Sequence, residues 1–111
     1  MTFKVTSTKE YFETLNKRFV GAQASGVEAV YQFELSGDEG GTWHVVVSNG
    51  TMAVHEGAHA SPTTTLKMKG DDYVKMSNGE LNGQVAYMTG KMKISGSIPL
   101  AMKMKNIFPQ A

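Results

Sequence analysis

Residues 43–54 read WHVVVSNGTMAV, and they join an alternating apolar segment to an Asn-Gly pair. Every second residue from Trp43 to Val47 is large and apolar, which is typical of a strand with one buried face. Asn49-Gly50 favours a type I′ hairpin turn, because both central residues of that turn need positive φ. Residues 52–54 then form the returning strand. The segment therefore predicts an antiparallel hairpin.

Three further strands extend this hairpin. Residues 27–35 alternate between apolar positions (Val27 to Leu35, every second residue) and polar ones, and the glycine-rich loop 37–41 connects them to Trp43. This predicts a three-stranded antiparallel meander. After a small, polar connection over residues 56–65, Leu66 and Met68 mark a fourth strand. Residues 91–95 mark a fifth, with Met92 and Ile94 facing inward.

Four helices are predicted from their end signals. A capping box at Ser7–Glu10 opens a helix expected over residues 8–23 and ending near Gly26. Asp71 is expected to cap residues 72–78, which Gly79 ends, and Asn82 to cap residues 83–89, which Gly90 ends. Ser97 is expected to cap the last helix, whose first turn contains Pro99.

Composition indicates a single globular domain over residues 1–111. The chain is 41% hydrophobic and 19% charged, with a net charge of +1. Cysteine is absent, which excludes disulfides, thiolate chemistry and cysteine-type zinc sites. No apolar segment approaches the ~20 residues of a spanning helix, so we expect a soluble, cytoplasmic protein. Residues 1–66 carry a net charge of −3 and residues 67–111 one of +4.

The second half also carries a specific pattern. It contains PTTTLKM at 62–68, DDY at 71–73, MSNGELN at 76–82, GKMKISG at 90–96 and LAMK at 100–103. This pattern resembles the sterol carrier protein 2 family of lipid-binding domains over about residues 10–108. The chain lacks the family's peroxisomal targeting tripeptide and ends soon after the last helix, so we expect a short prokaryotic member.

The resemblance implies an α+β fold: a five-stranded mixed sheet with helices packed on one face and an apolar tunnel for lipids. Side chains expected to face the tunnel alternate inward on the strands or lie on the helices opposite them. They are Trp43, Val45, Leu66, Met68, Tyr73, Met76, Val85, Met88, Met92, Ile94, Leu100, Met102, Met104 and Phe108. Methionine adapts to irregular apolar shapes, which suits either a ligand cavity or ordinary core filling.

Polar residues near this tunnel are candidates for headgroup or membrane contact. Lys91, Lys93, Lys103 and Lys105 are expected at the tunnel mouth, where they would attract a carboxylate, a CoA phosphate or an anionic membrane. The alternative is that they are solvated lysines without a specific role. Gln84 is a candidate headgroup partner or a helix-surface residue. The helix over residues 99–107 is either a lid or a static packing helix.

One catalytic motif occurs by residue type. His55, Glu56 and His59 match H-E-x-x-H, the zinc-protease motif, and Glu80 lies downstream as a third ligand. The motif requires a helix that places both imidazoles on one face, whereas here it continues a hairpin strand and contains Gly57. We therefore expect no metal and no cofactor. The aromatic residues lie at core spacing, which argues against nucleic-acid binding.

The sequence favours non-enzymatic binding, transfer or presentation of lipids: fatty acids, acyl-CoA or sterol-like molecules. Two alternatives stay open. One is an accessory domain that delivers a lipid to a partner enzyme, and the distant one is a small zinc hydrolase that uses His55, Glu56 and His59. The expected partners are the lipid ligand and a transient anionic membrane surface. We expect a monomer or a dimer.

Overall fold

A computed structural model describes residues 5–37 and 40–108, and it has the predicted α+β architecture. The strands are β1 (Glu28–Ser36), β2 (Gly41–Ser48), β3 (Thr51–Glu56), β4 (Thr64–Lys69) and β5 (Met92–Gly96). The α-helices are α1 (Thr8–Glu13), α2 (Gly70–Ser77), α3 (Gly83–Met88) and α4 (Ile98–Ile107). Short 3-10 turns cover Leu15–Lys17 and Gly21–Ala24. No helix within the described residues is long and apolar enough to cross a membrane.

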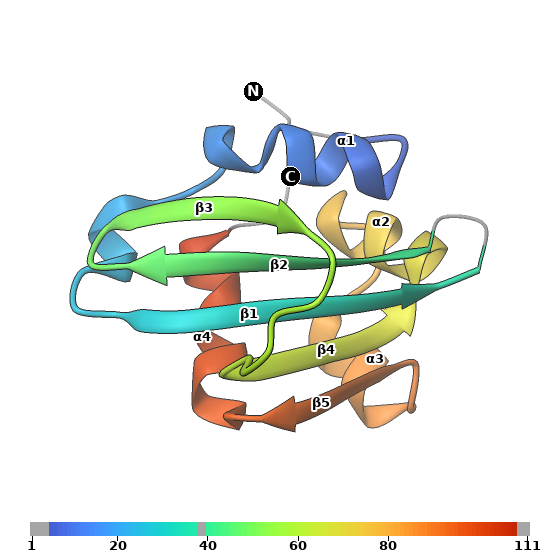
Figure 1. Cartoon of the computed structure of the whole chain (residues 1–111). Coiled ribbons are helices and arrows are strands. Elements are labelled where there is room, and N and C mark those ends of the chain that lie inside the picture. The colour runs from blue at the N-terminus through green and yellow to red at the C-terminus, as the bar shows by residue number, and fades with distance from the viewer. Residues whose placement is uncertain (1–4, 38–39, 109–111) are drawn as a thin grey trace.

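The five strands form one mixed sheet in the order β3-β2-β1-β4-β5 (Figure 1). β1–β2, β2–β3 and β4–β5 are antiparallel, whereas β1 and β4 are parallel. The predicted meander and the Asn49-Gly50 turn are confirmed, because Asn49 has a φ of 41° and Gly50 one of 85°. The β3–β4 connection crosses the face of the sheet that carries no helices (Figure 1).

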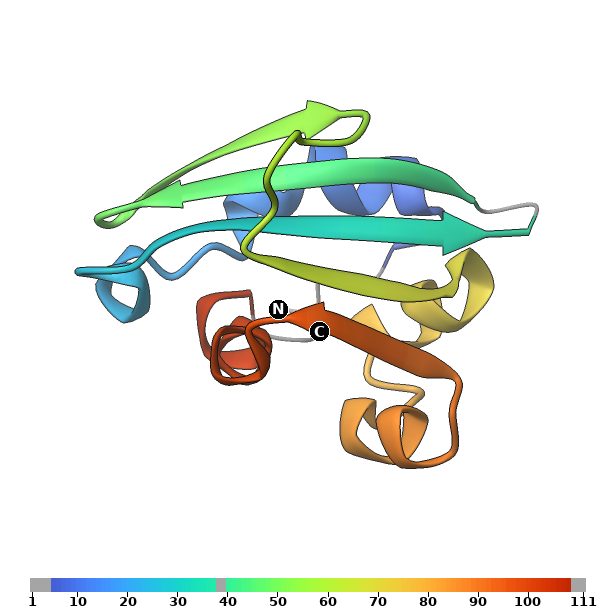
Figure 2. The same cartoon turned by 60° about the horizontal axis from the view of Figure 1, so that its bottom comes forward.

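The helices lie on the other face, as the turned view shows (Figure 2). Register places Phe33 beside both Trp43 and Leu66, so these inward side chains form one apolar surface across three strands. Phe12 of α1 packs on this surface: its ring lies 5.1 Å from that of Phe33 and 4.8 Å from that of Trp43, centroid to centroid. Tyr73 of α2 completes the aromatic cluster at 5.5 Å from Phe33.

The expected helix over residues 8–23 is wrong beyond Glu13. The Thr14 hydroxyl donates to the Glu10 carbonyl at 2.7 Å and competes with the helical ladder there. A 3-10 turn follows, and Val20 is extended, with its N–H donating to the carbonyl of Ile107 at 2.9 Å. The break lets the chain after α1 reach the end of α4, which a continuous helix would not do.

Two other helix starts were predicted correctly and one was not. Asn82 accepts hydrogen bonds from the N–H groups of Gln84 and Val85, and Ser97 accepts one from Leu100. Asp71, in contrast, does not cap α2. That helix begins at Gly70 directly after β4, so its N-cap is Lys69 and Asp71 lies in the first turn, where its charge suits the helix dipole.

Candidate functional site

A cavity of about 460 Å³ lies between the helical layer and the β4–β5 side of the sheet. This volume falls within the range of roughly 300–1,000 Å³ that is typical of small-molecule pockets. Its lining residues come from every α-helix and from both strands β4 and β5. They are Tyr11, Leu66, Tyr73, Met76, Ser77, Asn82, Gly83, Gln84, Tyr87, Met92, Ile94, Ala101, Met102, Met104 and Phe108.

The floor of the cavity is set by strand alternation. Leu66 pairs with Ile94 and Met68 with Met92 across the β4–β5 ladder, so their side chains project to one face. Lys67 and Lys93 pair between them and project to the other face, where both are exposed. A polar–apolar alternation that the sequence shows plainly therefore produces an apolar floor.

The inner end of the cavity is aromatic, and the buried guanidinium of Arg18 lies 4.8 Å from the centroid of the Tyr11 ring. Tyr11 and Tyr73 are buried, their rings lie 4.9 Å apart edge to face, and their side chains are hydrogen-bonded. Burial raises the pKa of Tyr11 above its ordinary value of 10.0, and mainly burial raises the pKa of Tyr73 well above it. Both phenols are therefore protonated and uncharged at neutral pH.

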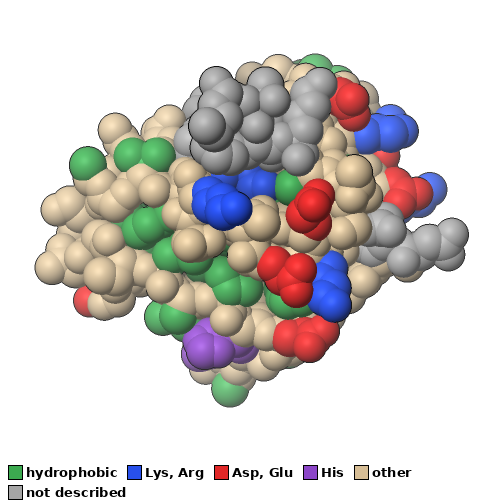
Figure 3. Space-filling model, turned by 90° about the horizontal axis from the view of Figure 1, so that it is seen from above, with side chains coloured by type: hydrophobic (Ala, Val, Ile, Leu, Met, Phe, Trp, Pro, Cys, Tyr) green, Lys and Arg blue, Asp and Glu red, His purple; other side chains and the backbone are tan. Residues whose placement is uncertain are grey.

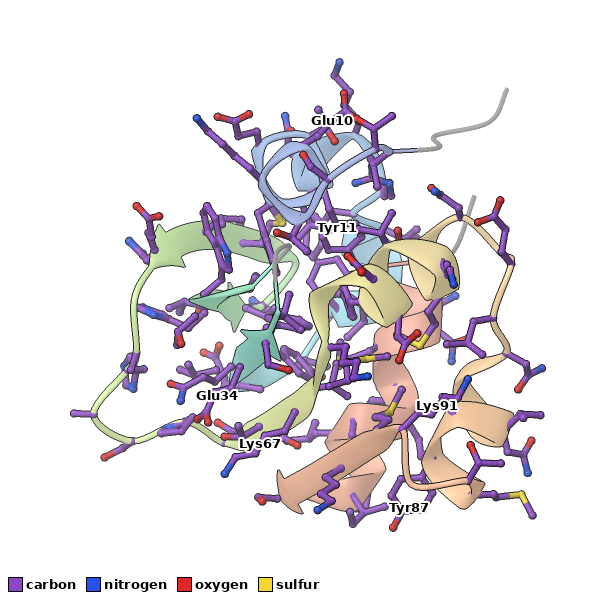
Figure 4. All side chains as sticks on the ribbon, turned by 90° about the vertical axis from the view of Figure 1, so that its right-hand side faces the viewer. Glu10, Tyr11, Glu34, Lys67, Tyr87 and Lys91 are labelled. Carbon is purple, nitrogen blue, oxygen red and sulfur yellow. The ribbon has the colours of Figure 1, made fainter. Side chains whose placement is uncertain are left out.

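The outer end lies between α3 and α4. Figure 4 shows Tyr11 on the underside of α1 and Tyr87 at the opposite end of the molecule. The cavity that both residues line therefore extends across the helical layer. Tyr87 and Met102 line it and are also exposed, which marks this end as its mouth. The outer end is thus apolar, accessible and formed by two short helices.

The structure brings together eight of the fourteen residues expected to face a tunnel. Those that line the cavity are Leu66, Tyr73, Met76, Met92, Ile94, Met102, Met104 and Phe108. Val45 and Met68 are buried core residues that do not line it. Trp43 borders a shallow depression between α1 and β3, and Leu100 is half-buried, with its carbonyl accepting a hydrogen bond from the Tyr31 hydroxyl at 3.0 Å.

The inward placement of Val85 and Met88 is wrong, because both are exposed on α3. Helix α3 has six residues and is apolar on several sides, so periodicity does not determine which side faces inward. Ala86 is fully buried, while Tyr87, which the sequence did not single out, lines the cavity.

Sequence reasoning also missed Tyr11, Ser77, Asn82, Gly83 and Ala101. Tyr11 lies next to Phe12, and two adjacent buried aromatics on a helix signal a wide apolar face. The small residues gave no such signal. The sulfur of Met76 lies only 3.3 Å from where a Cβ at position 83 would stand, so the glycine leaves room beside the cavity.

Only one of the candidate polar residues that the structure describes lies at the cavity. Gln84 lines the cavity, whereas Lys91, Lys93 and Lys103 are exposed and do not line it. The side chain of Lys105 lies outside the described part of the structure. The Ser97 N–H donates to the Thr63 carbonyl at 3.0 Å and fixes the start of helix α4. Movement of this helix as a lid stays a prediction.

The two histidines of the H-E-x-x-H motif lie on the helix-free face of the sheet, whereas Glu56 pairs with the inward-facing Trp43 and so projects to the other face. His55 is in β3 and His59 is in the connection after it, so the helix that a zinc-protease motif requires is not formed. The rings of both histidines contact His44, at 5.0 Å and 5.2 Å between centroids. Among the described residues, no group of three or more His, Asp or Glu side chains is arranged to hold a metal ion.

Comparison with known proteins places this geometry in a family. The model of the SCP-2 sterol transfer family matches residues 11–109. "Hydroxysteroid dehydrogenase-like protein 2" of Mus musculus is 36% identical over 105 residues, which make up 94% of this chain and 21% of that relative. The chain therefore spans about a fifth of the length of this curated relative.

Two solved structures carry the same fold. The sterol carrier protein domain 2 of Helicoverpa armigera is 28% identical, with a TM-score of 0.71 over 87% of this chain and 81% of that one. Palmitated SCP2L2 of Aedes aegypti is 25% identical, with a TM-score of 0.67 over 93% of this chain and 95% of that one. On its sequence and its fold, this chain belongs to the SCP-2 sterol transfer family.

Proposed function

We propose that this chain binds the apolar tail of a lipid, with fatty acids as the first candidates, and transfers or presents it without catalysing a reaction. The observation that carries the proposal is the cavity of about 460 Å³ with an apolar floor and a mouth between α3 and α4. Membership of the SCP-2 sterol transfer family supports it, as does the palmitate in the Aedes aegypti relative.

Physical magnitudes favour a loosely selective site. A chain of ~15 methylenes would gain roughly 12 kcal/mol on leaving water. Association and ordering would oppose this by about 4–15 kcal/mol, which leaves affinity in the micromolar range or weaker. Methionines 76, 92, 102 and 104 line the cavity, and their flexible thioethers adapt to chains of different shape. Acyl-CoA and sterol-like molecules are further candidate ligands of the same site.

A cavity-filling variant tests the proposal. Met104→Trp places a larger side chain into the cavity, so displacement of a fluorescent fatty acid should show affinity reduced roughly tenfold or more, equivalent to ~1.4 kcal/mol. Met88→Trp is the matched control, because Met88 is exposed and does not line the cavity. Equal affinities of the two variants, or no fatty-acid binding by the unmodified protein, would contradict the proposal.

A second function follows from the length comparison. Because the chain matches only 21% of the mouse relative, this domain type also occurs within longer proteins, and an accessory role beside an enzyme is a candidate. A carrier should pass a bound fluorescent fatty acid to acceptor vesicles without any other protein. An accessory domain that hands its lipid directly to an enzyme should retain it until that enzyme is added.

A further inference from the structure

Gly83 is the first residue of α3, and its backbone does not require a glycine. Eight of the described glycines have a positive φ, which L side chains rarely adopt, and Gly83 is not one of them. It follows the Asn82 cap at a helical position, where alanine would be the better helix former. The missing side chain at position 83 therefore needs another explanation.

Two cavity methionines lie next to the space that Gly83 leaves, which we call the Gly83 recess. A Cβ at position 83 would stand 3.3 Å from the sulfur of Met76 and 3.9 Å from the methyl carbon of Met92. Both atoms are at the ends of flexible side chains, one from α2 and one from β5, and both methionines line the cavity. At Gly40, in contrast, a Cβ would meet a backbone oxygen at 2.7 Å. Gly83 therefore gives room to lining side chains and not to the backbone.

Shape is the property by which this cavity can distinguish lipid tails. None of the described side chains that line it is charged. Acidic and basic side chains lie next to one another on the outside instead, for example on the face above α1 (Figure 3). In an apolar pocket, one added or missing methylene changes discrimination by roughly 10–200-fold. A space that a single methyl group would fill is therefore large enough to decide which tails fit.

An alanine at position 83 would favour the folded state in two ways. It propagates a helix better than glycine, and it leaves fewer conformations to the unfolded chain. Only the end of the Met76 side chain would have to give way, by a few tenths of an ångström. A residue that forgoes stability inside a binding site is typical of a role in function.

We propose that Gly83 sets the width of the lipid tail that the cavity accepts. The ends of Met76 and Met92 move into the Gly83 recess when a wide tail enters, such as a chain with methyl branches, and they close on a straight tail when they move back. Gly83 thus determines specificity through two methionines. This inference rests on the proposed function, because the recess has a use only if the cavity holds a lipid tail.

Competition against a fluorescent fatty acid measures this specificity. Palmitate is a straight chain, and phytanate carries four methyl branches on a main chain of the same length. The unmodified protein should bind both acids. Gly83→Ala fills the recess and should lower the affinity for phytanate roughly tenfold, while the affinity for palmitate changes less than about twofold. Failure of the unmodified protein to bind phytanate while it binds palmitate, or no selective loss of phytanate in Gly83→Ala, would overturn the proposal.

Two further variants test how Gly83 acts. Val85→Leu adds one carbon on the same helix, at an exposed position that does not line the cavity, and should leave the ratio of the two affinities unchanged. Met76→Ala in the Gly83→Ala background removes the side chain that the new methyl group crowds, and should restore phytanate binding. A shifted ratio in Val85→Leu, or no recovery in the double variant, would show that position 83 does not act through the cavity wall.

Thermal unfolding without lipid separates this role from a structural one. Gly83→Ala should unfold at the same temperature as the unmodified protein or at a higher one, whereas loss of a glycine that the fold needs would lower it. A clearly lower unfolding temperature therefore contradicts the proposal. Failure of the unmodified protein to bind palmitate contradicts the proposed function. An unchanged ratio of the two affinities in Gly83→Ala, with palmitate still bound, contradicts only the role of Gly83.

Discussion

The helical layer of this protein has two unlike sides. On the α1 side, Phe12 is almost fully buried and lies in contact with the rings of Tyr11, Phe33, Trp43 and Tyr73. On the α3 side, the small residue Ala86 is the buried member of a six-residue helix, and larger apolar neighbours face solvent. One side therefore holds the fold together by aromatic packing, while the other leaves an apolar space and exposed apolar side chains.

The largest expected effect tests the aromatic side. Phe12→Ala removes a buried ring and should lower the free energy of unfolding by about 3–5 kcal/mol, because the surrounding rings cannot fully close the space. Urea denaturation measures this. A loss no greater than that of a surface substitution would show that the aromatic cluster does not determine stability.

Alkaline pH should also act on the aromatic side. Burial raises the pKa of Tyr11 and Tyr73 in the folded protein above the ordinary value of 10.0, so above pH 10 the unfolded chain loses these protons first. Their contribution to stability is complete below pH 10 and falls as pH rises above it, by up to ~1.4 kcal/mol per pH unit for each group. Tyr73→Phe should flatten this decline in urea titrations between neutral and alkaline pH. An equal decline of stability with pH in the unmodified protein and in Tyr73→Phe would contradict a raised pKa at Tyr73.

A smaller change tests the α3 side alone. Asn82→Ala removes the cap that accepts hydrogen bonds from Gln84 and Val85, and should cost about 1 kcal/mol. Because α3 has few buried contacts, the loss should appear as faster hydrogen exchange in residues 83–88, with residues 8–13 unaffected. Equal acceleration in both helices would show that the two sides unfold as one unit.

The smallest effect is expected at Met88 on α3. Met88→Ala should change the free energy of unfolding by less than about 0.5 kcal/mol, because its side chain is mostly exposed. Thermal or urea unfolding checks this. A loss comparable to that of Phe12→Ala would mean that Met88 is covered within the protein, which would contradict its exposed placement on α3.

Strand alternation, the hairpin turn and helix caps are local signals, and they explain which parts of the fold the sequence could predict. The strands follow from alternation, the hairpin from Asn49-Gly50, and the starts of α3 and α4 from capping side chains. The end of α1 was not predictable from periodicity, because Phe12, Leu15 and Phe19 keep helical spacing through a 3-10 turn. Contact between the following segment and α4, through Val20 and Ile107, decides that geometry.

The cavity lining was predictable where strands supply it and less so where short helices do. Leu66, Met92 and Ile94 alternate on β4 and β5, and this fixes their direction. On α3 the apolar residues lie on several sides, so Val85, Met88 and Tyr87 could not be told apart by spacing. Small lining residues such as Gly83 and Ala101 carry no pattern, since their role is to leave space.

Methyl NMR of the methionines tests the central claim most directly, because methionines that line the cavity and methionines outside it report separately. With fatty acid added to delipidated protein, the methyl signals of Met76, Met92, Met102 and Met104 should shift, as all four line the cavity. The signals of Met52 on β3 and of Met88 should stay in place. Shifts spread evenly over all these methionines, or none at saturating fatty acid, would contradict a lipid site between the sheet and α2–α4.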